Sequence, residues 1–149
     1  MKIAIYPGSF DPITSGHLNI IQRASRIFDR LIVCVMVNAG KKPMFSLEER
    51  VALISKVVAD LPNVEVDGSD ELLAEYARRK GGCVIVKGLR AGSDFENEFQ
   101  MALINRKINP DLDTMFLTSA ATVLDTPIRS APIIVAPERE VPGNTAAKS

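Results

Sequence analysis

The segment from Gly8 to His17, with the sequence GSFDPITSGH, holds the residue types that phosphate chemistry needs, including the chain's only histidine. The apolar run Ile3–Tyr6 before it predicts a strand. The spacing of the residues after it predicts the buried face of a helix: Leu18, Ile21, Ala24, Ser25 and Phe28. Because the free N–H groups and the dipole at a helix N-terminus both favour anions, the segment predicts a phosphate site.

Within this segment, Gly8 and Gly16 have no Cβ, so a ligand could approach the backbone closely there. His17 would place an imidazole at the mouth of the site, where it could donate a hydrogen bond to a phosphoryl oxygen. A lone histidine near a helix start is more commonly a surface or packing residue, and spacing alone leaves that alternative open.

Basic residues follow two further predicted strands. Lys41 and Lys42 come after the apolar run Leu31–Val37, whose continuous hydrophobicity is typical of a strand covered on both faces. The sequence Lys87–Arg90 follows Cys83–Val86, and two cations that flank a glycine can clamp a polyphosphate. The alternatives are solvated loop lysines and an ordinary charged turn.

Strands and helices alternate along most of the chain. Ser46 with Glu49, and Ser93 with Glu96, have the spacing of capping boxes, and Ser69 is expected to cap another helix. The second helix is expected to end near Asp60. We expect strands at 3–6, 31–37, 64–66, 83–86 and 115–117. This order predicts an α/β fold with a five-stranded parallel sheet and helices on both faces.

In such sheets, ligands bind beyond the carboxyl ends of the strands, where the strand order reverses. The three segments Gly8–His17, Asn38–Phe45 and Lys87–Arg90 each follow a predicted strand. We therefore expect them to converge at one edge of the sheet.

The composition limits the possible partners. The chain has 149 residues and a formal net charge of zero, so no overall field attracts it to nucleic acid or to a membrane surface. With neither a membrane-length apolar run nor a signal-peptide pattern, the cytoplasm is the expected location. Cys34 and Cys83 lie in predicted strands without metal-ligand spacing, which favours buried free thiols.

The sequence changes character from Thr122 onward, where prolines recur every five residues, at 127, 132, 137 and 142. Such spacing excludes a long helix. We therefore predict one domain over 1–121 and a largely irregular tail over 122–149, in which 133–135 could form a short strand.

Several strings resemble known enzymes. The order Ser9…Thr14-x-Gly16-His17 resembles the nucleotidyltransferase superfamily, and YPGSFDP at 6–12 is similar to the bacterial phosphopantetheine adenylyltransferases. The strings KKPMFSLEER at 41–50 and KGLR at 87–90 resemble the same family. The resemblance spans roughly 2–119 and implies a Rossmann-like nucleotidyltransferase fold.

The resemblance implies transfer of the adenylyl group of ATP to 4′-phosphopantetheine, giving dephospho-coenzyme A and pyrophosphate. The attacking phosphate is already anionic, so positioning and charge stabilisation suffice without a general base. His17 is implied as the catalytic residue, donating to the α-phosphate. The resemblance also implies Mg²⁺ held by phosphates and water rather than by protein ligands, and assembly as a homohexamer.

The binding residues are implied by position. Those for substrate are Ser9, Lys41, Leu73 and Lys87; those for ATP are Ser9, Phe10, His17, Gly88, Leu89, Arg90 and Glu98. Lys42 is expected to be solvated, and helical periodicity would equally place Leu73 in the core. Asn97 stands where the family usually has tyrosine.

The resemblance fails after Ser119. The family continues with a serine cluster that helps hold the nucleotide, whereas this chain has VLDTPIR at 123–129. Two alternatives therefore stay open. One is a related transferase that uses nicotinate mononucleotide or a glycerol or sugar phosphate, and the other is a nucleotide-binding module with impaired turnover.

Overall fold

A computed structural model describes residues 1–37, 40, 42–89, 95–118 and 128 of the chain. Strands and helices alternate in it as the sequence predicts. The elements are β1 (Ile3–Gly8), α1 (Ser15–Ile27), β2 (Arg30–Met36), α2 (Leu47–Val57), β3 (Val64–Ser69), α3 (Leu73–Lys80), β4 (Val84–Leu89), α4 (Phe95–Ile108) and β5 (Asp113–Thr118).

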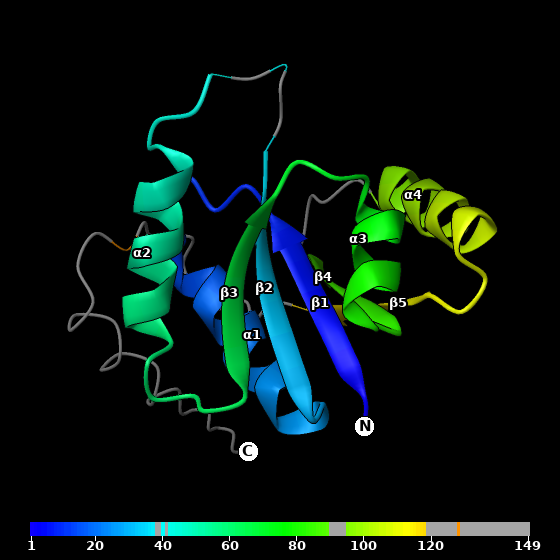
Figure 1. The fold of residues 1–149 in the computed structure, drawn as a ribbon, viewed down its shortest axis with the longest axis horizontal. Helices are drawn as coiled ribbons and strands as arrows, with labels where there is room; N and C mark the ends of the chain where they lie inside the picture. Colours follow the sequence, from blue (N-terminus) through cyan, green and yellow to red (C-terminus); the bar gives the residue numbers. More distant parts are fainter. Residues whose placement is uncertain (38–39, 41, 90–94, 119–127, 129–149) are drawn as a thin grey trace.

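The strands form one five-stranded parallel sheet in the order β3-β2-β1-β4-β5 (Figure 1). The chain runs outward from β1 to β3 and then returns past β1 to build β4 and β5. The strand order therefore reverses between β1 and β4, which is where ligands bind in sheets of this kind. The predicted parallel sheet is confirmed.

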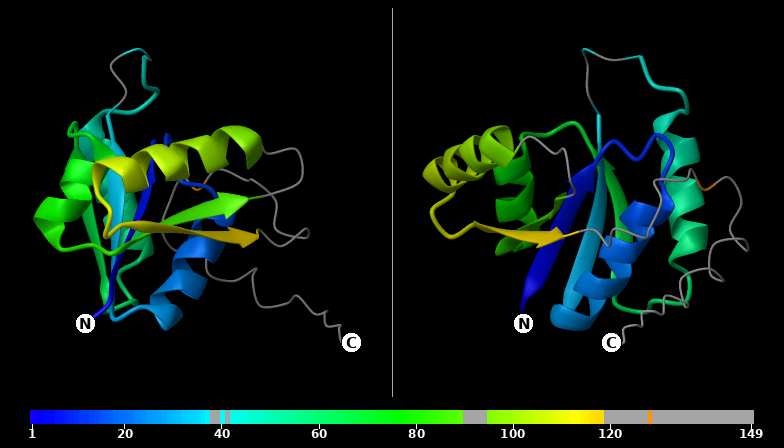
Figure 2. Two further views of the ribbon diagram at one scale, coloured as in Figure 1. Left: turned by 90° about the vertical axis from the view of Figure 1, so that its right-hand side faces the viewer. Right: turned by 180° about the vertical axis from the view of Figure 1, so that it is seen from behind.

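Helices cover both faces of the sheet, as predicted. The cluster on one face joins α1 and α2 to strand residues that include Ala4, Val33 and Val86. The cluster on the other face joins α3 and α4 to alternate strand residues such as Ile5 and Ile32. Figure 2 shows α1 and α4 on opposite sides of the sheet. Because successive strand side chains point to opposite faces, the three central strands β1, β2 and β4 contribute to both clusters.

Local capping residues decide where the helices begin. At α2, Ser46 Oγ accepts from Glu49 N at 3.1 Å, and Glu49 Oε1 accepts from Ser46 N at 2.8 Å. The predicted capping box is therefore confirmed. The helix ends at Val57, with Val58 as its C-cap, earlier than the predicted end near Asp60.

The prediction that Ser69 caps the third helix is wrong. Ser69 is the last residue of β3, where it pairs with Met36, and its carbonyl oxygen accepts from Val37 N at 3.0 Å. The N-cap of α3 is Leu72, whose side chain makes no capping bond. Pairing along the sheet edge therefore overrides the local capping preference. The predicted cap at Ser93 lies outside the described residues.

The two cysteines are free, as predicted, but their surroundings differ. Cys34 is buried within β2, whereas Cys83 is only half-buried and lies just before β4. Burial raises the pKa of the Cys34 thiol to about 11, which keeps it protonated and unreactive.

One residue of the predicted tail, Ile128, belongs to the described part of the chain. Its side chain is 5% exposed in the cluster on the α1 and α2 face. Its backbone N–H donates to the carbonyl oxygen of Ile13 at 2.8 Å, so it packs beside the turn that follows β1. The other residues of 122–149 lie outside the described set, and the proposed boundary at 121 stays a prediction. No helix in the described ranges is long and apolar enough to cross a bilayer.

Candidate functional site

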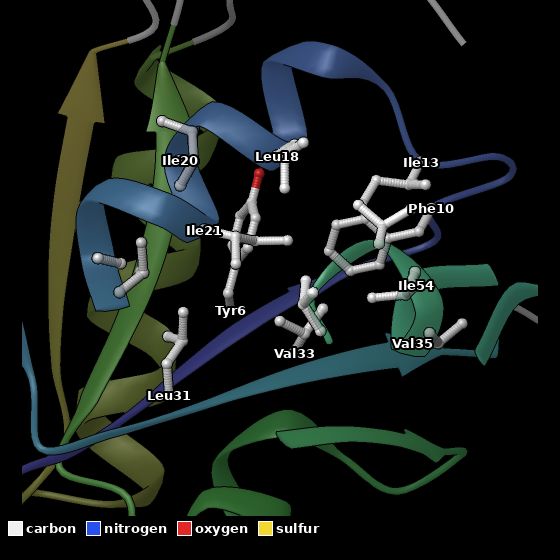
Figure 3. Close-up of a cluster of buried hydrophobic side chains, with 14 of the residues drawn as sticks. Tyr6, Phe10, Ile13, Leu18, Ile20, Ile21, Leu31, Val33, Val35 and Ile54 are labelled. Atoms are coloured by element: carbon white, nitrogen blue, oxygen red, sulfur yellow. The ribbon is translucent and has the colours of Figure 1, made fainter. Parts of the chain in front are cut away.

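The turn between β1 and α1 begins later than predicted, because β1 continues through Pro7 and Gly8 in register with β2. A Cβ built on Gly8 would lie 3.0 Å from Cζ of Phe10. Gly8 therefore makes room for the Phe10 ring. Phe10 is 2% exposed and has a φ of 46°, a left-handed conformation that is uncommon for a bulky residue. Figure 3 shows its ring in the same cluster as Ile13 and Ile54, and we infer that this burial holds the strained turn in place.

His17 is oriented by a reciprocal pair of hydrogen bonds with Thr14, the N-cap of α1. The backbone N–H of Thr14 donates to His17 Nδ1 at 3.0 Å, and the backbone N–H of His17 donates to Thr14 Oγ1 at 3.2 Å. Because Nδ1 is the acceptor, the neutral imidazole carries its proton on Nε2. The helix start therefore fixes Nε2 as the ring's donor, and donation from it to a phosphoryl oxygen stays a prediction.

Two aromatic rings pack against the imidazole of His17. The centroid of the Phe10 ring lies 4.9 Å from that of His17, edge to face, and the Tyr6 ring lies 6.5 Å away. Burial raises the pKa of Tyr6 far above the neutral range, so its hydroxyl stays protonated. The ring of His17 is consequently held on one side by its helix cap and on another by apolar packing.

The end of β4 supplies a second group of predicted residues. Lys87 Nζ lies 3.2 Å from Glu98 Oε1, so β4 and α4 are joined by an ion pair whose side chains are 32% and 29% exposed. A Cβ built on Gly88 would lie 3.3 Å from Cγ1 of Ile20 and 3.8 Å from the hydroxyl oxygen of Tyr6. Gly88 thus allows β4 to lie close to α1, beside one of the rings that pack against His17.

The other predicted residues are placed as follows. Ser9 is exposed directly after β1, and Leu89 is the last residue of β4. Leu73 is the first residue of α3 and packs against the cluster on the α3 face, so the core interpretation is confirmed and the binding role stays a prediction. Lys41 and Arg90 lie outside the described residues, whereas Lys42 is exposed, as expected.

The structural roles of Thr14, Arg50 and Asp11 were not predicted from the sequence. The spacing of Thr14 and His17 matches a capping box, with histidine in place of the usual glutamate, and could have indicated their reciprocal bond. Arg50 shares the buried face of α2 with Ile54 and Val57, and that spacing could have marked it as a buried charge. For Asp11, which contacts the segment after β2, the sequence carries no local signal.

Comparisons with known proteins identify relatives of this chain. Residues 5–137 match the family model described as cytidylyltransferase-like. Three relatives carry the name phosphopantetheine adenylyltransferase. That of Alkaliphilus metalliredigens is 62% identical over 78% of this chain and 74% of its own length. That of Clostridium tetani is 58% identical over 81% and 76%, and that of Caldanaerobacter subterraneus is 55% identical over 80% and 75%.

Solved structures share the fold at lower identity. A lipopolysaccharide core biosynthesis protein from Thermoplasma volcanium has a TM-score of 0.59 and 20% identity over 80% of this chain and 97% of its own. A bifunctional NMN adenylyltransferase/ADP ribose pyrophosphatase from Francisella tularensis has a TM-score of 0.60 and 18% identity over 84% of this chain and 39% of its own. Both similarities concern the arrangement of strands and helices.

Proposed function

The chain belongs to the phosphopantetheine adenylyltransferase family, and we propose that it transfers the adenylyl group of ATP to 4′-phosphopantetheine. The observation that carries the proposal is the Thr14–His17 pair, which leaves Nε2 as the ring's donor beside the reversal point of the sheet. A fixed donor at a helix N-terminus suits a reaction in which negative charge develops on a phosphoryl group.

In the proposed reaction, a phosphate oxygen of 4′-phosphopantetheine attacks the α-phosphorus of ATP. The bond from that phosphorus to the β-phosphate bridging oxygen breaks, and pyrophosphate leaves with the bonding electrons. The attacking phosphate is already anionic, so the chain needs to supply position and charge rather than a base. His17 Nε2–H donates to the α-phosphate as charge develops on it.

The remaining roles follow the family positions. Ser9 and Lys41 orient the reacting phosphates, and Lys87 meets the incoming phosphopantetheine. The ATP contacts are assigned to Phe10, Gly88, Leu89, Arg90 and Glu98. The ion pair between Lys87 and Glu98 supports a site at this place. A substrate phosphate can replace Glu98 as the partner of Lys87, and the Glu98 carboxylate can then contact the nucleotide.

We propose that Mg²⁺ enters with ATP. Within the described ranges, no group of three or more His, Cys, Asp or Glu side chains gathers into a metal site. The described part of the chain therefore offers no such ligand cluster, and no step is assigned to the ion. Its ligands would be phosphate oxygens and water, as magnesium prefers. Chelation with EDTA should abolish turnover, and excess Mg²⁺ should restore it.

We also propose that the chain acts in the cytoplasm and forms a homo-oligomer, with a hexamer as the expected size. The helix α4 supports the second proposal, because its large apolar side chains are about half exposed: Phe95, Phe99, Met101, Leu103 and Ile104. A helix that is apolar on several sides is normally covered. Sedimentation equilibrium tests the size, and cell fractionation tests the location.

The decisive experiment measures pyrophosphate release from ATP with and without 4′-phosphopantetheine. We expect release that requires the acceptor, and none with nicotinate mononucleotide or glycerol 3-phosphate in its place. Release with one of those acceptors instead would favour the related-transferase alternative. ATP binding without any release would favour the binding-module alternative.

A further inference from the structure

Side-chain hydrogen bonds join the turn after β1 to the segment that leads into α2, and they come from both sides. Asp11, in the turn after β1, accepts from Met44 N at 2.6 Å through Oδ2 and from Phe45 N at 2.8 Å through Oδ1. Arg50, on α2, donates from Nη1 to the carbonyl oxygen of Ser9 at 3.0 Å. Each segment therefore anchors the other.

The hydrogen bonds of Asp11 and those of Arg50 fix different parts of the proposed phosphate site. Asp11 accepts from the successive amides of Met44 and Phe45 with its two carboxylate oxygens, so it fixes the segment that leads into α2. Charge-assisted hydrogen bonds of this kind are about twice as strong as neutral ones. Arg50 fixes the carbonyl group of Ser9, the residue assigned to orient the phosphates.

Arg50 is also a buried charge. It is 6% exposed, and among the described residues it has no ion-pair partner within 4.0 Å. Its second hydrogen bond is from Nε to the carbonyl oxygen of Ser46 at 3.3 Å. A buried guanidinium is costly unless it is hydrogen-bonded, and these neutral carbonyls accept from two of its five N–H groups without cancelling its charge. Its field therefore extends toward the turn that would hold phosphate.

The geometry points to Asp11 and Arg50 as positioning residues that hold the turn at Ser9 against the segment at 44–46, at the start of α2. The inference rests on the proposed function, since it concerns the phosphates of the same reaction. Neither side chain is assigned a contact with substrate. Asp11 acts through the backbone at Met44 and Phe45, close in sequence to the assigned Lys41, and Arg50 acts through Ser9.

The chain offers a matched control at the same helix start. Glu49 accepts from Ser46 N at 2.8 Å, next to Arg50 in the sequence, and its capping bond involves no residue of the turn after β1. Glu49→Ala removes one capping bond of comparable length. It should lower the thermal midpoint without changing phosphate binding.

The test is a double-mutant cycle on the full chain, read as the dissociation constant of 4′-phosphopantetheine by calorimetry. We expect Asp11→Ala to weaken binding about tenfold, and to add less than twofold when Lys41 is already alanine, because coupled residues are not additive. Asp11→Asn, which keeps the shape and one acceptor oxygen, should show the same coupling and serves if the alanine variant fails to fold. Arg50→Met should weaken binding while Glu49→Ala leaves it unchanged.

Each outcome decides the matter. Coupled losses at Asp11 and Lys41, in variants that still unfold cooperatively, support positioning by Asp11 whatever the drop in thermal midpoint. Weaker binding by Arg50→Met supports positioning by Arg50, and unchanged affinity in that variant overturns it. An active wild type with additive losses, or with unchanged affinity in both Asp11 variants, overturns the positioning role alone. A wild type that binds no 4′-phosphopantetheine overturns the proposed function, and the positioning role with it.

Discussion

Substitution of His17 should separate its part in the helix cap from its part in the reaction. In His17→Asn, the amide oxygen lies close to the place of Nδ1 and can still accept from Thr14 N, but no atom replaces Nε2. In His17→Gln, the longer side chain can bring an N–H group near the place of Nε2. His17→Ala removes both functions at once.

The sizes of the two effects differ. Losing the acceptor for Thr14 N leaves one backbone donor without its 3.0 Å bond, which costs about 1 kcal/mol of unfolding free energy. For a chain of this length, that corresponds to about 2–4 °C in the melting temperature. Losing a preorganised donor to a developing oxyanion costs about 10²–10³ in kcat. We therefore expect His17→Asn to keep the wild-type melting temperature and to lose most of its turnover.

The assay compares thermal melting with coupled pyrophosphate release for all three variants. His17→Ala should lose both stability and turnover, whereas His17→Gln should recover part of the turnover. KM for ATP should change little, because the proposed bond strengthens mainly in the transition state. If His17→Asn kept kcat within a few-fold of the wild type, the Nε2 donor would not be part of catalysis.

Three further predictions concern charge, pH and packing. Lys41→Ala should raise KM for phosphate-bearing substrates about tenfold or more while the exposed Lys42→Ala changes it less than twofold; equal losses would contradict the assignment. Burial raises the pKa of Asp67, but hydrogen bonds from the Tyr76 hydroxyl at 2.7 Å and from Gly68 N outweigh it, so the pKa lies below its usual value. That stabilisation is present above the unfolded pKa of about 3.9 and is lost as pH falls through the folded one. In urea unfolding, Tyr76→Phe should therefore cost about 1–2 kcal/mol at pH 7, and the cost should decrease as pH falls below the unfolded pKa; a pH-independent cost would count against the bond. Ile128→Ala should lower the unfolding free energy by about 2–4 kcal/mol, whereas a residue that merely lay on the surface would change it by less than 0.5 kcal/mol.

Patterns within a few residues predicted the element order and the capping box of α2, because both depend on local side-chain and backbone chemistry. The extents of the strands were harder to predict. Pro7 and Gly8 are poor strand formers, yet both belong to β1, since pairing with Cys34 and Val35 continues through them. At Ser69, the same long-range pairing prevented a locally favourable cap from forming.

The candidate site also has a part that local patterns predicted and a part that depends on long-range contacts. The helix-start histidine and the basic strand ends could be located from the sequence, since each lies where a local pattern changes. The partner of Lys87 is Glu98, on the helix that follows β4, and periodicity alone does not determine which groups meet across that connection. The contacts of Asp11 with Met44 and Phe45 join segments 33 and 34 residues apart, so they depend on the finished topology.

The apolar surface of α4 has a consequence for how the protein behaves in solution. Its five large apolar side chains are between 46% and 50% exposed, and the chain carries no net charge at pH 7. Little electrostatic repulsion therefore keeps two molecules apart near neutrality. Association of chains through α4, the face assigned to the homo-oligomer, should therefore be tightest near pH 7 and weaker at pH 9, where the net charge becomes negative. Light scattering at low chain concentration would record it as an average mass that is highest near pH 7 and rises further when ammonium sulfate is added.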